Sequence, residues 1–126
     1  MSKERNKFDL EELLIEFAVR VIRTAGSLPK TKTGNHISGQ LIRSGTSPAP
    51  NYGEAQSAES RADFVHKMRL ALKELRETRI WLLIVVSADL IKPTSKLDDL
   101  LDESNPLISI FVKSIGTAKK NKDKTS

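Results

Sequence analysis

Apolar residues recur at steps of three and four over a long central stretch, from Ser60 to Ile91. This spacing keeps side chains on one face of an α-helix, so it predicts one long helix over 60–91. Ser60 offers an oxygen to the unpaired amides of the first turn, and Pro93 disfavours continuation beyond the predicted end. At ~1.5 Å per residue this helix is roughly 45 Å long and needs partners of similar length.

Three further stretches have helical spacing, and they predict helices over 9–25, 35–58 and 95–115. No strand-like alternation is long enough to build a sheet. The 126 residues are expected to form one domain over 1–118, followed by a disordered basic tail over 119–126. Four helices with short connections predict an all-α fold, in the form of an up-down-up-down four-helix bundle.

The stretch 43–58, RSGTSPAPNYGEAQSA, supports two interpretations. Propensity alone indicates a loop, because its two prolines and two glycines disfavour a helix interior. A long unstructured loop is nevertheless uncommon in a compact bundle, and small residues also allow another backbone to approach closely. Propensity therefore leaves the continuity of the second helix open.

Charge is unevenly distributed along the chain, whose net charge is +5. Residues 27–80 carry nine basic and five acidic side chains, and residues 113–126 carry five and one. Residues 81–112, in contrast, carry two basic and five acidic side chains. Segregated basic charge indicates a nucleic acid as partner.

Several classes of protein are disfavoured by composition. The chain has no cysteine, which excludes disulfides and thiol chemistry. The first residues are charged and do not resemble a signal peptide, and the strongly apolar run 80–86 is too short to span a bilayer. We expect a cytoplasmic protein with no membrane partner.

Candidates for catalysis or metal binding are few. A carboxylate-bridged metal pair in a helical bundle requires two Glu-x-x-His motifs and two more glutamates. The chain contains Asp63-x-x-His66 once, and His36 has no acidic residue three positions before it. No phosphate-binding GxxxxGK[ST] loop occurs. We expect no enzymatic activity, no metal and no cofactor.

Nucleic-acid binding is the leading functional hypothesis. Arg69, Lys73 and Arg76 are spaced four and three apart on the central helix, so they share one face. Aromatic residues for base stacking are not evident, so binding is expected to be directed at phosphates and sensitive to salt. The expected nucleic-acid-binding residues are Lys30, Lys32, Arg43, Arg69, Lys73, Arg76, Arg79, Lys119 and Lys120.

The competing hypothesis is a protein-interaction scaffold with no nucleic-acid ligand. Residues 81–86 are apolar nearly all round the helix, which implies more burial than one four-helix core supplies. Excess apolar surface of this kind usually becomes a subunit interface. Both hypotheses therefore predict a homo-oligomer.

Two stretches, SGTSPAPNYGEA and ADFVHKMRLALKELRETRIWL, resemble a known family. It comprises the small four-helix-bundle proteins encoded by intervening sequences inside bacterial 23S ribosomal RNA genes, and it is similar to the accessory variability proteins of diversity-generating retroelements. The usual Asn-Ile-Ala-Glu-Gly of the family is Asn-Tyr-Gly-Glu-Ala at 51–55 here, after two prolines. The matching positions are Asn51, Glu54, Leu72, Glu74 and Leu75, with a further polar position at Glu77.

The resemblance implies that 43–58 is mostly helical, with a bend at Pro48 or Pro50. It also implies a homopentameric ring and, as partners, nucleic acid and a reverse transcriptase, with no catalytic residues. From their own chemistry, four polar residues are expected to form a layer where the second and third helices meet, hydrogen-bonded within the chain or across a subunit interface, or else to form a binding site. These residues are Asn51, Glu54, Glu74 and Glu77.

Overall fold

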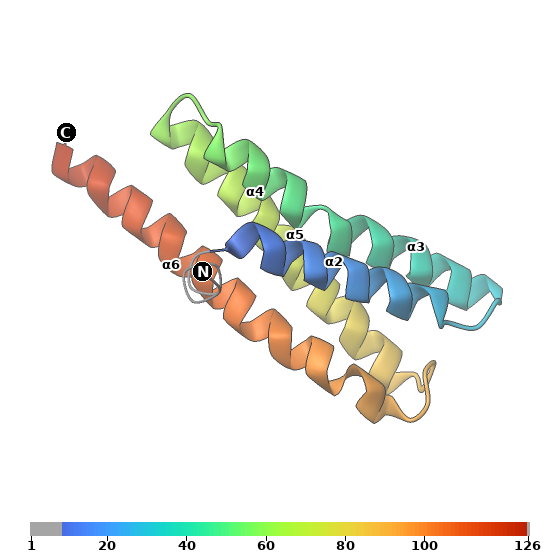
Figure 1. Ribbon diagram of the computed structural model, residues 1–126. Coiled ribbons are helices and arrows are strands. Elements are labelled where there is room, and N and C mark those ends of the chain that lie inside the picture. Colours follow the sequence, from blue (N-terminus) through green and yellow to red (C-terminus); the bar gives the residue numbers. More distant parts are fainter. Residues whose placement is uncertain (1–8, 126) are drawn as a thin grey trace.

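The computed structural model describes residues 9–125, with side chains placed through residue 121. Its elements are α2 (Leu10–Gly26), α3 (Lys32–Thr46), α4 (Pro48–Gln56), α5 (Arg61–Ser87), the short 3-10 helix η1 (Thr94–Leu97) and α6 (Asp98–Thr125). Figure 1 shows α3 and α4 following one another along one side of the bundle, so together they act as one broken helix. Helix α2 packs on α3, both α3 and α4 pack on α5, and α5 packs on α6. The predicted all-α four-helix fold is confirmed.

Helix α5 holds the core together, because its inner face is buried along its whole length. Met68, Leu75 and Leu82 on that face are at most 1% exposed, and Phe17 of α2 and Phe111 of α6 are fully buried against the same core. Burying each large apolar side chain of this kind stabilises the fold by roughly 1.5–3 kcal/mol. The residues of α5 that face away from the core are correspondingly left on the surface.

Side-chain caps begin α2, α3 and α5. The Ser60 hydroxyl accepts a hydrogen bond of 3.0 Å from the amide of Asp63, which confirms the predicted start of α5. Thr31 accepts from the amide of Gly34 at 3.0 Å, so α3 begins at Lys32 instead of residue 35. Each cap satisfies an amide that has no partner inside its helix.

Helix α5 ends at Ser87, four residues before the predicted end. Asp89 has a φ of 54°, and its amide donates to the carbonyl of Val86 at 3.1 Å. The amide of Leu90 reaches back to the carbonyl of Val85, also at 3.1 Å. This pair of bonds is the Schellman arrangement, which closes a helix through one left-handed residue. It turns Leu90 and Ile91 back toward the core, where Ile91 is 8% exposed.

The predicted helix 35–58 is divided in two by a single residue, Ser47. Pro48 and Pro50 occupy the first and third positions of α4, where backbone amides have no intrahelical partner. Both prolines are therefore tolerated, although neither fits in the interior of a continuous helix. The bend that the family resemblance implies is found at this point, and the alternative of a loop over 43–58 is wrong.

Gly45 allows α2 and α3 to approach closely. A Cβ atom at this position would lie 2.6 Å from Cγ1 and 2.9 Å from Cβ of Val21, which is itself fully buried. Real Cβ atoms essentially never come so close to a neighbour, so with any larger residue at position 45 the Val21 side chain or the helices themselves must shift. This contact explains why a glycine occurs at position 45, although its low helix propensity favoured a loop in the sequence analysis.

Helix α6 is longer than the sequence predicts. The predicted helix ends at 115 and is followed by a disordered tail over 119–126, but the backbone of α6 is helical through Thr125. Gly116 does not stop the helix, because one glycine costs only about 1 kcal/mol. Pro106 lies inside α6 without ending it. Five residues before Pro106, the carbonyl of Leu101 accepts a hydrogen bond of 3.1 Å from Arg79, which joins this part of α6 to α5.

Substituting Gly45→Ala is expected to destabilise the fold by about 1–3 kcal/mol, because the added methyl group overlaps Val21. Urea unfolding followed by circular dichroism measures the change. Gly53→Ala in α4 is the matched control, because a Cβ atom there meets nothing within 4 Å and alanine favours the helix. Equal stability of the Gly45→Ala variant and the wild type would contradict the close approach.

Candidate nucleic-acid interface

Three basic residues stand on the outer face of α5, as the sequence predicts. Arg69, Lys73 and Arg76 are all exposed. None of them forms a salt bridge with any residue in the described part of the chain. Their charges are therefore available to an external anion.

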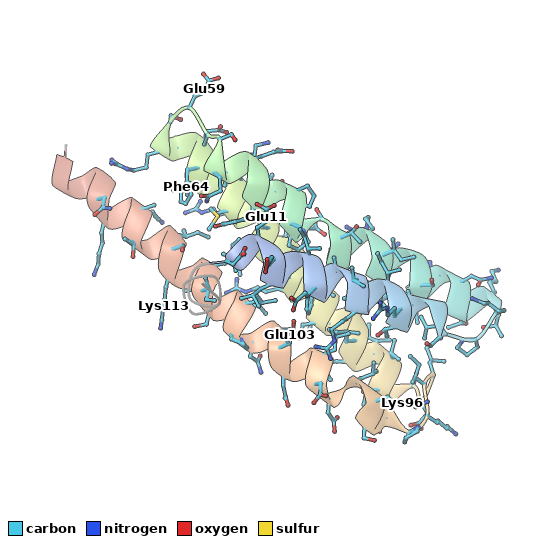
Figure 2. All side chains as sticks on the ribbon, viewed as in Figure 1. Glu11, Glu59, Phe64, Lys96, Glu103 and Lys113 are labelled. Atoms are coloured by element: carbon cyan, nitrogen blue, oxygen red, sulfur yellow. The ribbon has the colours of Figure 1, made fainter. Side chains whose placement is uncertain are left out.

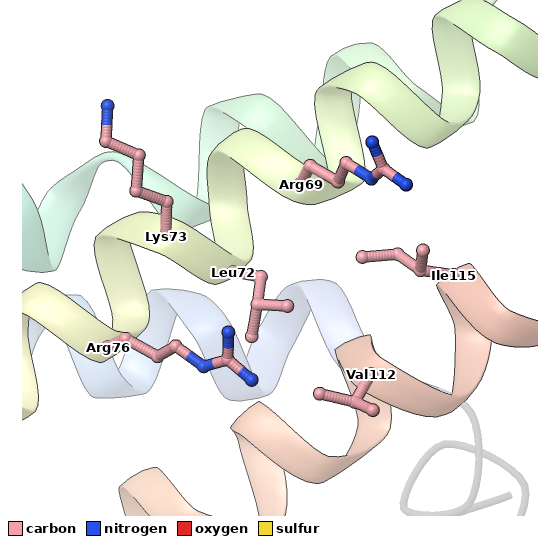
Figure 3. Close-up of a pocket in the computed structure, with 6 residues that line it drawn as sticks. All are labelled: Arg69, Leu72, Lys73, Arg76, Val112 and Ile115. Carbon is pink, nitrogen blue, oxygen red and sulfur yellow. The ribbon is translucent and has the colours of Figure 1, made fainter.

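A shallow groove of about 390 Å³ runs beside these residues, between α5 and α6. Its apolar floor is formed by Leu72 together with Val112 and Ile115 of α6. Figure 3 shows the guanidinium groups of Arg69 and Arg76 directed toward α6 on either side of this floor. The Lys73 ammonium extends along the other side of α5, so the three charges are spread across the width of the helix.

Helix α6 extends the basic surface toward its C-terminal end. Lys119 follows Ile115 by one helical turn and so lies on the stripe that borders the groove, and both Lys119 and Lys120 are exposed. Lys113 lines an adjacent groove with Phe64 of α5, and Figure 2 labels both residues. We call the following set the basic face: Arg69, Lys73, Arg76, Lys119 and Lys120.

Arg43 and Arg79 are bound to other residues of the bundle, unlike the residues of the basic face. Arg43 donates to Glu74 at 3.0 Å and also forms an ion pair with Glu77. The guanidinium of Arg79 donates to the Leu101 carbonyl and, at 3.0 Å, to the hydroxyl of Ser104. We therefore leave both arginines out of the proposed surface, although the sequence placed them in it.

Lys30 and Lys32 lie at the far end of the bundle from Lys119 and Lys120. They belong to the connection between α2 and α3 and to the start of α3, near the point where α5 connects to α6. Figure 2 labels Lys96 at that end of the bundle. Phe64 and Glu59, at the opposite end, are well separated from it. The basic residues expected to bind nucleic acid are thus divided between two regions.

Within one chain, Asn51, Glu54, Glu74 and Glu77 do not form a single hydrogen-bonded layer. Asn51 donates to the carbonyl of Ser47 at 3.1 Å, within its own turn. Glu54 forms an ion pair of 2.7 Å with Lys67, which raises the pKa of that lysine. Glu74 and Glu77 lie two to three turns further along α5 and bind Arg43. The Glu54–Lys67 ion pair therefore joins α4 to α5, and the contacts of Arg43 with Glu74 and Glu77 separately join α3 to α5.

Two hydrogen bonds made by α5, one to α3 and one within α5 itself, are absent from the sequence-based predictions. A buried hydrogen bond of 2.9 Å joins the hydroxyls of Thr78 and Ser44, both 0% exposed. Above it, the indole of Trp81 donates to Glu77 at 3.0 Å. This hydrogen bond, more than the nearby charge of Arg43, holds the pKa of Glu77 below its ordinary value of 4.5.

The outer face of α5 changes from basic to apolar along its length. Ile80, Leu83 and Ile84 continue the stripe of Arg69, Lys73 and Arg76, and they are 55%, 37% and 38% exposed. A second exposed apolar stripe lies on the other side of the bundle, over α2 and α3. It consists of Ile15, Val19, Ile22 and Ile42.

Comparison with known proteins places this architecture in a family. The family model of the 23S rRNA-intervening sequence protein matches residues 7–113. The chain belongs to the 23S rRNA-intervening sequence protein family. The expected family membership is thereby confirmed. The matched residues include α2, α3, α4, α5 and the first part of α6, and with α5 they include Arg69, Lys73 and Arg76 of the basic face.

A solved structure supports the same fold for this family member. It is a crystal structure of a protein of unknown function from the S23 ribosomal protein family of Bacteroides thetaiotaomicron VPI-5482. The two sequences are 32% identical, and the TM-score is 0.77 over 84% of this chain and 97% of the other. No curated protein matches this chain. The similarity to retroelement accessory proteins stays a prediction.

The two histidines of this family member lie on different helices, His36 on α3 and His66 on α5, three residues before Arg69. His36 is exposed and contacts Trp81 edge-on, with ring centroids 6.0 Å apart. Over the described residues, no three histidine or acidic side chains gather as metal ligands would. In the same part of the chain, no helix is both long and apolar enough to span a bilayer.

The lowered pKa of Glu77 makes stability depend on pH in a definite direction. Its ionised form is favoured in the folded state, so the stabilisation is present above the ordinary pKa of 4.5 and is lost as pH falls through the lower folded value. Glu77→Gln should cost about 1 kcal/mol at pH 7, and the difference from wild type should shrink in acid. Urea unfolding at several pH values measures both.

Exposed Glu59→Gln is the control for this pH dependence, since Glu59 lies in the connection before α5, away from Trp81 and Arg43. It should leave the pH dependence as in the wild type. A Glu77→Gln variant that loses the same stability at pH 3 and pH 7 would show that the carboxylate does not act through its charge.

Proposed function

We propose that this chain is a non-enzymatic, homo-oligomeric bundle that binds nucleic acid through the basic face. The observation that carries the proposal is the contrast among its arginines. Arg43 and Arg79 are tied into the bundle, whereas Arg69 and Arg76 project over the α5–α6 groove with no salt bridge to a described residue. A solvated arginine with no internal partner is suited to a phosphate, which its planar group binds through two hydrogen bonds.

Binding of this kind recognises the nucleic-acid backbone more than its sequence. The basic face offers guanidinium and ammonium groups, which contact phosphates, and the aromatic side chains nearest to it are engaged in packing. Tyr52 contacts Phe111 edge-on, and Phe64 packs against the core. We therefore expect affinity that falls steeply with salt and varies little with sequence.

The exposed apolar stripes support self-assembly. One stripe lies on the outer face of α5 and the other lies over α2 and α3, on a different side of the bundle. Two different apolar surfaces on one subunit favour a head-to-tail interface, which closes into a ring when the rotation allows it. A ring of five, which the family resemblance implies, repeats the basic face five times and strengthens a weak contact by avidity.

A protein-interaction scaffold is the second candidate function, and the apolar half of α5 favours it. Ile80 is 55% exposed, and a groove of about 350 Å³ lies along Ile80, Leu83 and Ile84. A partner protein, for example a reverse transcriptase, is then the occupant of this surface. Under this alternative the basic face has no role in binding.

Neutralising the α5 part of the basic face tests nucleic-acid binding. The triple variant Arg69→Gln, Lys73→Gln, Arg76→Gln should lose at least about tenfold in affinity and show a shallower salt dependence, because three phosphate contacts are removed. Fluorescence anisotropy of labelled structured RNA and duplex DNA across a salt series measures both quantities.

The matched control removes the same number of charges at the other end of the bundle, with Arg23→Gln, Lys92→Gln and Lys96→Gln. It should retain most of the affinity, since these residues lie away from the basic face. Equal losses of affinity in the two variants would show that binding depends only on the net charge of the protein. If the wild type does not bind nucleic acid even at low salt, the scaffold is favoured.

Charging the apolar half of α5 tests assembly. Ile80→Lys with Ile84→Lys should convert the oligomer to monomers, because two ammonium groups cannot be buried without partners. Sedimentation equilibrium distinguishes the 14.0 kDa chain from an assembly of several copies. A wild type that sediments as a monomer at every concentration tested would contradict the proposed oligomer.

A further inference from the structure

A second concave surface lies at the end of the bundle where α2 ends and α5 connects to α6. It is a pocket of about 330 Å³, and three chain segments contribute basic side chains to its lining. Arg23 comes from the last turn of α2, Lys92 from the connection after α5, and Lys96 from η1. Figure 2 labels Lys96 at this end, and we call the cavity the end pocket.

Among the residues that the structure describes, no acidic side chain lines the end pocket. Asp89 and Asp98 are close in sequence, but neither contributes to the lining, and no described residue forms a salt bridge with Arg23, Lys92 or Lys96. Three cations around one small cavity repel one another and raise the local potential. Binding an anion there relieves this repulsion.

The hydroxyl groups of the lining are already used as donors. Thr24 donates to the carbonyl of Arg20 at 2.9 Å, and Ser27 donates to the carbonyl of Arg23 at 3.1 Å. The side-chain donors that remain at this pocket are therefore the three cationic groups. This set favours an anionic ligand over a neutral polar one.

The apolar side of the end pocket is fixed in place by the core. Leu97 is 1% exposed and Ile91 is 8% exposed, and both contribute to the lining. The Schellman turn at Asp89 orients the connection that carries Ile91 and Lys92. The pocket is therefore formed before a ligand arrives, which lowers the entropic cost of binding.

We propose that the end pocket binds a small phosphate monoester of about the size of a mononucleotide. The three cations contact the phosphate group, and Ile91 and Leu97 contact the organic part. The pocket volume lies at the lower end of the range of about 300–1,000 Å³ that is typical of small-molecule sites. This inference does not depend on the proposed function, because neither its residues nor its ligand involve the basic face.

Isothermal titration calorimetry with adenosine monophosphate tests the proposal on the full-length protein at fixed ionic strength. The wild type should bind adenosine monophosphate measurably, and inorganic phosphate more weakly because it lacks an organic part. Uncharged adenosine should not bind. The exposed substitutions Lys92→Gln and Lys96→Gln should lower the affinity for adenosine monophosphate by about tenfold or more, since two charge-assisted contacts are lost.

The Lys30→Gln, Lys32→Gln variant is the matched control, because it removes two exposed charges at the same end of the bundle that do not line the end pocket, and it should bind adenosine monophosphate as the wild type does. Circular dichroism of each variant verifies the helical fold. The proposal is overturned if adenosine monophosphate does not bind the wild type, if adenosine binds equally well, or if both variants lose affinity to the same extent. Each of these outcomes is independent of whether a nucleic-acid polymer binds the basic face.

Discussion

Burial of the inner face of α5 is the constraint on which the rest of the structure depends. This helix alone packs against α3, α4, η1 and α6, so its apolar inner residues are fully used by the core. The remaining side chains of α5 must then face outward. The result is an outer stripe that carries Arg69, Lys73 and Arg76 in one half and Ile80, Leu83 and Ile84 in the other.

The two halves of this stripe suit different partners. Solvated cations that form no salt bridge with a described residue favour phosphates, whereas exposed isoleucine and leucine favour burial against protein. A single helix face can therefore hold one subunit against the next and leave its basic half beside the α5–α6 groove. Arg43 and Arg79 show the alternative use of a basic residue, because each one fixes α5 to a neighbouring helix.

Helical spacing was sufficient to predict the bundle, the basic stripe of α5 and the cap at Ser60. The division of the second helix at Ser47 needed the family resemblance, because Pro48 and Gly45 each lower helix propensity when considered alone. The structure shows why both are accommodated: Pro48 needs no amide partner at the start of α4, and Gly45 makes room for Val21.

Other features depend on tertiary contacts that no local pattern contains. Asn51 and Glu77 were expected in one layer because both are polar and lie on facing helices, but the antiparallel register places them turns apart. The end pocket was missed for a similar reason, since Arg23 and Lys96 meet only after α2 and η1 have been folded together. Residues that share a helix face can be predicted from spacing, whereas residues that converge from separate segments cannot.

Photo-cross-linking of the protein to bound RNA, followed by identification of the modified peptides, tests the central claim most directly. If the basic face is the binding surface, cross-links should appear in peptides that contain Arg69–Arg76 and the C-terminal turns of α6. Cross-links confined to α2 or α3, with none on α5, would contradict the account.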